Sequence, residues 1–186
     1  PPHILQTLSG QGQLTVDEGV VHNLNLLRDV FEKLSMIPGL VERLQERLPP
    51  SYLKKLEARD TVLAPLVVSF TINGNVANFR QIQITTDTVQ IIGDSTVGLD
   101  GRITAQALLL IDPDFSLALA KSVNEFRYLA DPQGRIGIPL VIQGILPELR
   151  VFPDLKYVAA KLAISKTSEV IGDLIQKKFG KKEEPS

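Results

Sequence analysis

The sequence predicts an α+β fold, in which an antiparallel, twisted and curved β-sheet meander carries amphipathic helices packed on one face. Apolar residues alternate with polar ones from residue 66 to residue 111, as in strands that bury one face. Segments before and after this stretch space their apolar residues by three and four, the period of an amphipathic helix. In these strands every second residue is apolar, whereas the residues between them are partly apolar and partly polar. This pattern favours an antiparallel sheet that is covered on one side.

The first third of the chain changes from a strand pattern to a helical one. Residues 12–16 alternate and are followed by a turn, which predicts a short strand and the start of a second. Residues 24–34 and 40–48 each carry an apolar stripe with helical spacing. The Pro38-Gly39 pair between them predicts a break, so we expect two helices here.

The central stretch is divided into strands by turn residues. Asn73-Gly74-Asn75 separates two alternating runs, and Asp100-Gly101 lies between two more. We expect Gly101 to adopt a positive φ, because a tight hairpin needs a left-handed conformation that a β-carbon penalises. The pattern therefore predicts a meander of sequential hairpins, the platform on which the helices pack.

A helix and another strand are predicted after the meander. Asp112 precedes Pro113, the arrangement of a capping carboxylate before a proline at the first helical position. The apolar stripe that follows predicts a helix ending near Pro132. From Gly134 onwards the residues alternate again. Pro139 within this strand indicates a sheet edge or a point where no ladder bond is needed.

The chain ends with a long helical pattern and a charged tail. Asp154 precedes an apolar stripe over residues 155–179, which predicts a last amphipathic helix. We expect residues 1–179 to form a single domain of sheet and helices, and residues 180–186 to be a disordered charged tail.

Composition excludes several function classes. The 20 basic and 21 acidic residues nearly balance, and only 5% of residues are aromatic, so we expect no nucleic-acid partner. The absence of cysteine removes disulfides, thiol nucleophiles and thiolate metal sites. No apolar run approaches the ~18 residues that a membrane-spanning helix needs. Because the chain opens with Pro1-Pro2 and not with Met, we expect it to be part of a longer protein.

Two segments resemble the C-terminal region of the AsmA family of bacterial envelope proteins. Residues 70–101 are similar to its strand, its Asn-Gly turn and its G-x-G-x-V-x-L strand, although the second glycine is replaced after Gly93. Residues 134–147 are similar to its closing I-x-I-P strand, with Ile145 in place of a threonine, and Pro153-Asp154 matches its ending. Together with residues 12–27, the resemblance touches about two thirds of the chain.

The resemblance implies a non-catalytic function in lipid handling. Members of the family have an inner-membrane helix and a periplasmic body of repeating β-sheet that forms an apolar groove. They are implicated in phospholipid transport between the inner and outer membranes and in outer-membrane homeostasis. On this basis the chain is expected to be a periplasmic module of an inner-membrane-anchored protein, with phospholipid acyl chains and an envelope protein as partners. The alternative is a protein–protein interaction or scaffolding module that docks through its C-terminal amphipathic helix.

The side chains that commonly carry chemistry favour structural roles. The two histidines, His3 and His22, lack the spacing of a metal site. Asp112 and Asp114 are better explained as helix capping than as an acid–base pair. We therefore predict no enzyme activity, no cofactor and no catalytic or metal site.

The apolar sheet face is the candidate site, and it has two interpretations. It is a core covered by the helices, or it is a groove wall that contacts acyl chains; both hold in part if the helices close one end of a groove. Small residues on one strand leave room above the sheet for either occupant. The residues expected to contact lipid are Ile103, Ala105, Ala107, Leu109, Ile138, Leu140 and Ile142.

Overall fold

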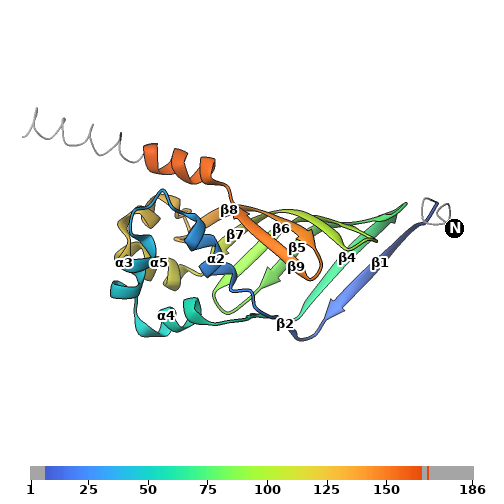
Figure 1. Ribbon diagram of the computed structural model, residues 1–186, viewed down its shortest axis with the longest axis horizontal. Coiled ribbons are helices and arrows are strands. Elements are labelled where there is room, and N and C mark those ends of the chain that lie inside the picture. The colour runs from blue at the N-terminus through green and yellow to red at the C-terminus, as the bar shows by residue number, and fades with distance from the viewer. Residues whose placement is uncertain (1–6, 165–166, 168–186) are drawn as a thin grey trace, which may run out of the picture.

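The computed structural model describes residues 7–164 and residue 167, and these form the predicted α+β fold around a seven-stranded sheet (Figure 1). Every pairing in this sheet is antiparallel. β4 to β7 form the predicted meander, and β8 and β9 continue it after the second group of helices. In spatial order the strands are β1 (Ser9–Val16), β4 (Leu66–Asn73), β5 (Val76–Thr85), β6 (Val89–Gly98), β7 (Arg102–Ile111), β8 (Gly137–Ile145) and β9 (Glu148–Pro153).

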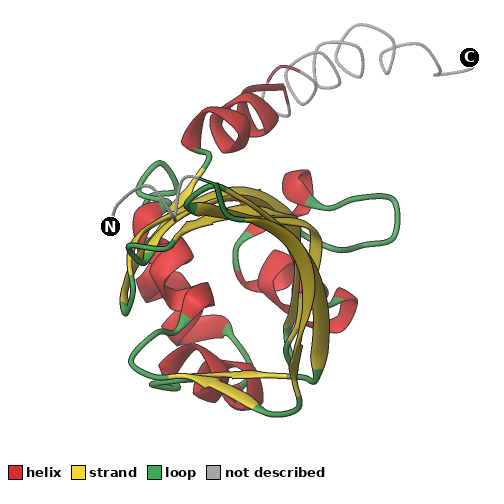
Figure 2. Cartoon of the chain, turned by 90° about the vertical axis from the view of Figure 1, so that its right-hand side faces the viewer, coloured by secondary structure: helices red, strands yellow, loops and turns green. Residues whose placement is uncertain are grey.

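Most of the helices gather at one end of the sheet (Figure 1), and the last helix lies outside its curve (Figure 2). One group lies between β2 (Gly19–Val21) and β3 (Thr61–Leu63), which pair as a separate ribbon, and the other lies between β7 and β8. The predicted break at Pro38-Gly39 is confirmed. The helices are α2 (Leu26–Lys33), α3 (Leu40–Arg47), α4 (Pro50–Glu57), α5 (Pro113–Ser122) and the 3₁₀-helix η1 (Asn124–Leu129).

The sheet bends at a β-bulge in β5. The register with β6 shifts between Phe79 and Ile82, and Gln81 there has a φ of 53°. The Gln81 backbone N–H donates to the Asp94 carboxylate of β6 over 2.8 Å, which holds the bulge in place. On β6 next to the bulge, a Cβ on Gly93 would lie only 2.2 Å from a backbone oxygen of β7. Only glycine permits this approach, so the bulge and Gly93 together allow the curvature seen in Figure 2.

The two glycine turns are confirmed. Gly74 has a φ of 62° between β4 and β5, and Gly101 has a φ of 81° between β6 and β7. The Gly101 backbone N–H donates to the Gly98 carbonyl over 2.9 Å, and the Asp100 carboxylate accepts from the Arg102 N–H over 3.0 Å. Asp100 therefore stabilises the turn that Gly101 makes possible.

The predicted N-cap of α5 is confirmed, but the predicted continuous helix to Pro132 is wrong. The Asp112 carboxylate accepts from the backbone N–H groups of Asp114 and Phe115. The helix then stops at Val123, whose φ of −136° is extended and whose side chain is fully buried. A β-branched residue is stiff in χ1 and tolerates extended backbone well. After this break η1 continues, and it still buries Phe126.

The strand predicted from Gly134 begins later, at Gly137. Gly134 has a φ of 78° and its N–H donates to the Asp131 carbonyl, so it belongs to a turn. Ile136 forms only an isolated bridge with Ala130 before β8 starts. The short strands β3 and β9 were not predicted, because their few residues give too little periodicity to recognise.

Pro139 does not lie in an edge strand, so that alternative is wrong. β8 lies between β7 and β9, with Pro139 opposite Leu108. The Pro139 carbonyl accepts from the Asp154 N–H over 2.8 Å, so the backbone of Pro139 faces β9. The β9 ladder ends one pair earlier, at Pro153 opposite Leu140. The missing N–H of Pro139 therefore faces a position where no ladder bond is needed, which was the second alternative.

One hydrophobic core joins the helices to the sheet. Tyr52 of α4 stacks on Phe115 of α5 with ring centroids 4.4 Å apart, and Phe31 of α2 packs on Phe126 of η1 at 5.2 Å. Each of these contacts joins the helices before the meander to those after it, so residues far apart in sequence form a single core.

The last helix is described only in part. Asp154 accepts from the Tyr157 N–H over 3.0 Å and so caps the helix, and residues 155–164 are helical. The rest of the apolar stripe predicted to residue 179, and the tail over 180–186, lie outside the described residues. Among the described helices, none combines the length and the apolar character needed to cross a membrane.

Candidate functional site

The strand registers place one parity of β4 to β9 on the face that the helices cover. Ala107 lies opposite Gly93 on β6 and Leu140 on β8. One pair further from the helices, Ala105 lies opposite Ser95 and Ile142. Directly opposite residues of an antiparallel pair point to the same side, so all these residues share the inner side of the curved sheet. We call it the concave face.

Three of the residues predicted to contact lipid lie in the helix-covered part of the concave face. Leu109 and Ile138 are 0% exposed, and Leu140 is 3% exposed. They belong to the core that contains Phe115 and Leu119 of α5. In this structure they are packed against protein, as the covered-core interpretation expects.

The other four lie further along the same strands, where side chains become half-exposed. On β7, Ile103, Ala105 and Ala107 are half-buried, and Ile142 occupies the corresponding part of β8. Ala107 and Ile142 touch the edge of the core, whereas Ile103 and Ala105 lie beyond it. The structure therefore divides the predicted set between a covered half and an open half of one face.

The open half extends across the sheet, and sequence analysis identified only part of it. In addition to Ile103, Ala105 and Ile142, residues of four further strands share this face by register. Their alternation was visible in the sequence, but their place beyond the reach of the helices was not. We call this set the open concave face: Phe70, Ile72, Ala77, Phe79, Val97, Ile103, Ala105, Ile142 and Leu149.

Small residues form a floor where the open concave face meets the covered half. Gly93 and Ser95 lie opposite Ala107 and Ala105, next to the bulge where the sheet bends. Larger side chains, such as Phe79 on β5, stand on either side of this floor. A surface that combines a small-residue floor with bulky apolar sides has the shape and chemistry to hold an extended hydrocarbon chain.

Charged side chains are confined to the opposite, convex face in this region. Arg80 lies 3.8 Å from the Asp94 carboxylate, and Arg102 lies 3.8 Å from the Asp100 carboxylate. Thr104 and Gln106, the neighbours of Ala105 along β7, are exposed on the same outer side. The open half of the sheet is therefore amphipathic, apolar within its curve and polar outside it.

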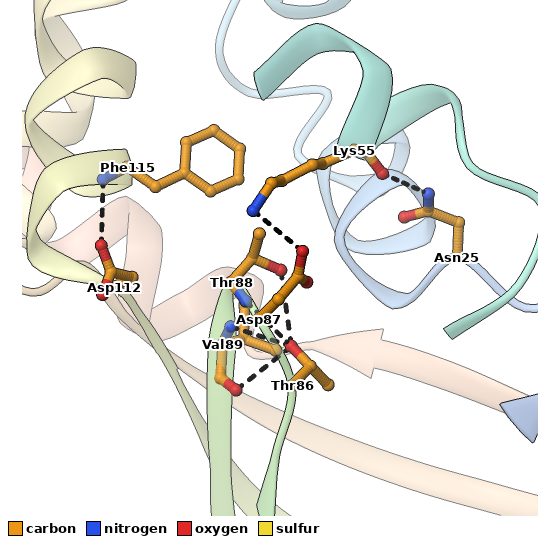
Figure 3. Close-up of polar contacts among 8 residues, drawn as sticks. All are labelled: Asn25, Lys55, Thr86, Asp87, Thr88, Val89, Asp112 and Phe115. Carbon is orange, nitrogen blue, oxygen red and sulfur yellow. Dashed lines mark hydrogen bonds and ion pairs between the residues drawn. The ribbon is translucent and has the colours of Figure 1, made fainter. Parts of the chain in front are cut away.

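A pocket of about 160 Å³ lies at the junction of sheet and helices, and both polar and apolar side chains line it. Figure 3 shows the polar contacts in this region. Lys55 of α4 pairs with Asp87 in the β5–β6 turn at 2.8 Å. The Thr86 hydroxyl accepts from the Thr88 and Val89 backbone N–H groups in that turn. These groups bond to one another and tie the turn to the helices, which is a structural role.

Asn25 ties α4 to α2 at the same junction. Its Oδ1 accepts from the Arg28 N–H as the N-cap of α2. Its Nδ2 donates to the carbonyls of Lys55, Leu56 and Ala58 at the end of α4, over 2.9, 3.1 and 2.8 Å. One side chain thus satisfies the start of one helix and the end of another.

The described residues offer no metal site, since no group of three or more His, Asp and Glu side chains converges. His22 contacts the Asp60 carboxylate at 3.2 Å, at the protein surface. The Asn23 backbone N–H, followed by His22, holds the pKa of Asp60 below its ordinary value. Asp112 and Asp114 belong to the cap of α5, as predicted.

No protein-family model, curated protein or solved structure matches this chain. The resemblance to the AsmA family therefore rests on the sequence motifs over residues 70–101 and 134–147.

Proposed function

We propose that the chain is a non-catalytic lipid-handling module that holds phospholipid acyl chains on its open concave face. One observation carries the proposal: this face has apolar residues on every strand from β4 to β9, most of them half-exposed, and of its nine residues only Ile142 packs against the core that contains the helices. A contiguous apolar patch of this kind on a protein surface is typical of a binding site.

The placement of the helices explains why this face stays open. They gather at one end of the sheet (Figure 1). On β7, Leu109 and Ile111 at that end are 0% exposed, whereas Ile103 and Ala105 towards the other end are half-exposed. The helices therefore cover one half of the strand and leave the other half open. An acyl chain laid along the remaining half would gain about 0.8 kcal/mol for each CH₂ group removed from water.

The resemblance to the AsmA family supports the biological setting of this proposal. In that setting the chain is the periplasmic C-terminal module of an inner-membrane-anchored protein, and its concave face is one section of an apolar β-groove. The groove moves phospholipid between the inner and outer membranes and contributes to outer-membrane homeostasis, together with an envelope protein partner. The module's contribution is to shield acyl chains from water, and no bond is made or broken.

Measurement of bound phospholipid tests the proposal. The protein is incubated with vesicles of phosphatidylethanolamine and phosphatidylglycerol, re-isolated without detergent, and its phospholipid is quantified by mass spectrometry after solvent extraction. Ala105→Phe places a bulky ring on the floor of the open concave face and is expected to remove most of the bound lipid. Gln106→Phe, the next residue on the same strand, places the same ring on the convex face and is expected to leave lipid binding unchanged.

An interaction module is the alternative, and exposed apolar residues of the last helix favour it. Leu155 and Ile164 are 40% and 65% exposed. If the wild-type protein carries no phospholipid, or if both phenylalanine variants bind it equally, the lipid-handling proposal fails and docking through this helix becomes the better account. Melting temperatures of both variants show whether either ring has damaged the fold.

A further inference from the structure

The two edges of the seven-stranded sheet are built differently. β9 forms one edge and β1 the other (Figure 1). An edge strand exposes backbone N–H and C=O groups that can pair with another strand, and proteins usually block such edges with charges, prolines or covering elements. The structure shows these devices on β9 and lacks them on β1.

The outer edge of β9 is blocked by a lysine and a proline. The backbone of Pro139 faces β9, so in the alternating ladder Val151 and Pro153 turn their backbone groups outward. Lys33 of α2 donates to the Val151 carbonyl over 2.6 Å, and its Nζ also lies 5.3 Å from the centre of the Phe152 ring. Pro153 has no N–H to offer. A further strand therefore has little to pair with on this side.

The outer edge of β1 is open along its whole length. The Leu8 carbonyl accepts from the Gly74 N–H at the start of the β1–β4 ladder, so the even-numbered residues of β1 face β4. The alternate residues turn both backbone groups away from the sheet, and no described residue bonds to them. These outward-facing residues are Ser9, Gln11, Gln13 and Thr15. None of the four is charged or a proline, and all four are exposed.

From this contrast we infer that β1 is a self-association edge, on which a second copy of this chain pairs antiparallel to form a twofold dimer. The inference goes beyond the proposed function and does not depend on it. With the axis at Gly12, Ser9 lies opposite the second copy's Thr15, and Gln11 lies opposite the second copy's Gln13. All of these are outward-facing residues, so every pair exchanges both of its backbone hydrogen bonds.

The side chains of β1 fit this register. Leu14, which is 49% exposed, lies opposite Gly10 of the second copy. A Cβ at Gly10 would have nothing within 4 Å, so the space above it is open to the leucine. No charged residue lies within β1, so the pairing brings no like charges together. Because the other edge is blocked by Lys33 and Pro153, the assembly closes at two copies and does not grow into a fibre.

The dimer would also change the concave face. A twofold axis perpendicular to the sheet keeps both concave faces on one side and places the two helix-covered ends at opposite ends of the joined sheet. The two open concave faces then form one continuous apolar surface across the β1 pair.

Sedimentation velocity of the full chain over a range of concentrations measures the association. The account predicts a dimer that dissociates on dilution. Gln13→Pro removes an outward N–H and leaves the β1–β4 ladder intact, so it is expected to weaken dimerisation roughly tenfold or more. Gln13→Thr keeps the N–H and is expected to dimerise as the wild type does. A wild-type protein that stays monomeric at every concentration, or equal dimerisation of both variants, would overturn the inference.

Disulfide capture tests the register, and it is clean because the chain contains no cysteine. Ser9→Cys mixed with Thr15→Cys is expected to form a cross-linked heterodimer, since opposed residues lie within disulfide range. Either variant alone is expected not to cross-link, because identical positions would lie roughly 20 Å apart. Self-linking of Ser9→Cys would indicate a parallel or shifted pairing and would contradict the proposed register.

Discussion

The two halves of β7 present the same pattern to the same face and meet different surroundings. Leu109 and Ile111 are 0% exposed beneath the helices, whereas Ile103 and Ala105 remain half-exposed on the open concave face. The alternation of apolar and polar residues does not distinguish these two pairs, because it indicates only on which face of the sheet a side chain lies. The difference arises because the helices gather at one end of the sheet and cover only that part of the strand. Apolar residues at every second position of a strand therefore indicate that their side chains share a face of the sheet, and not that they share a buried core.

The largest expected effect contrasts two truncations on this one strand. Leu109→Ala leaves a cavity in the closed core, so it should lower the free energy of unfolding by about 2–5 kcal/mol. Ile103→Ala on the open concave face should cost about 1 kcal/mol or less. Urea titration of both variants measures the difference. Equal losses would mean that both halves are closed core, and the comparison between them would break down.

The covered half also depends on the contacts that hold its helices together, and Asn25 makes several of them. Asn25→Ala should lower the free energy of unfolding by about 2 kcal/mol, because the N-cap of α2 and the hydrogen bonds from Nδ2 to the carbonyls at the end of α4 are lost together. Asn25→Asp keeps the N-cap of α2 but places a carboxylate oxygen, which cannot donate a hydrogen bond, next to the carbonyl oxygens at the end of α4. This variant should therefore be no more stable than Asn25→Ala. If the aspartate variant matches the wild type in thermal melting, the contacts to α4 contribute nothing.

In the open half, the backbone of the turns should matter more than side-chain burial. Gly101→Val places a β-branched residue at a φ of 81° and should cost about 1–2 kcal/mol. Gly101→Asn is the matched control, since asparagine tolerates this conformation, and it should cost less. An unchanged urea midpoint for Gly101→Val would contradict the claim that the fold depends on the left-handed conformation of Gly101.

The smallest effect concerns a charge in the loop between η1 and β8. The Arg135 backbone N–H, together with the Arg135 guanidinium, holds the pKa of Asp131 below its ordinary value. A depressed folded-state pKa stabilises the protein above the unfolded value of about 3.9, and this contribution is lost as the pH falls through the folded pKa. Asp131→Asn should therefore lower the melting temperature slightly at pH 6, and the difference from wild type should shrink below about pH 4. A difference that stays constant with pH would show that the carboxylate charge is not the cause.

Local chemistry made much of the fold predictable. The turns at Gly74 and Gly101 and the cap at Asp112 follow from conformational preferences that act over a few residues, and the structure confirms them. Non-local features were harder to predict. The break at Val123 depends on burial of that side chain, and the interior position of Pro139 depends on where β9 ends.

The candidate site was predictable in part for the same reason. Period-two alternation placed Ile103, Ala105 and Leu109 on one face, and the registers confirm that they share it. It did not reveal that Leu109 is covered while Ile103 is not, because coverage depends on helices distant in sequence. Phe70 and Phe79 complete the open concave face through the order of the strands, which only the assembled sheet reveals.

Photo-crosslinking at two adjacent residues of β7 tests the central claim most directly. A photoreactive amino acid replaces Ile103, on the open concave face, or Thr104, on the convex face, in otherwise identical proteins. Each is irradiated with vesicles of phosphatidylethanolamine and phosphatidylglycerol, and covalent adducts are identified by mass spectrometry. The account predicts phospholipid adducts at position 103 and few or none at position 104. Equal capture at both positions, or adducts at neither, would contradict the claim that the open concave face contacts lipid.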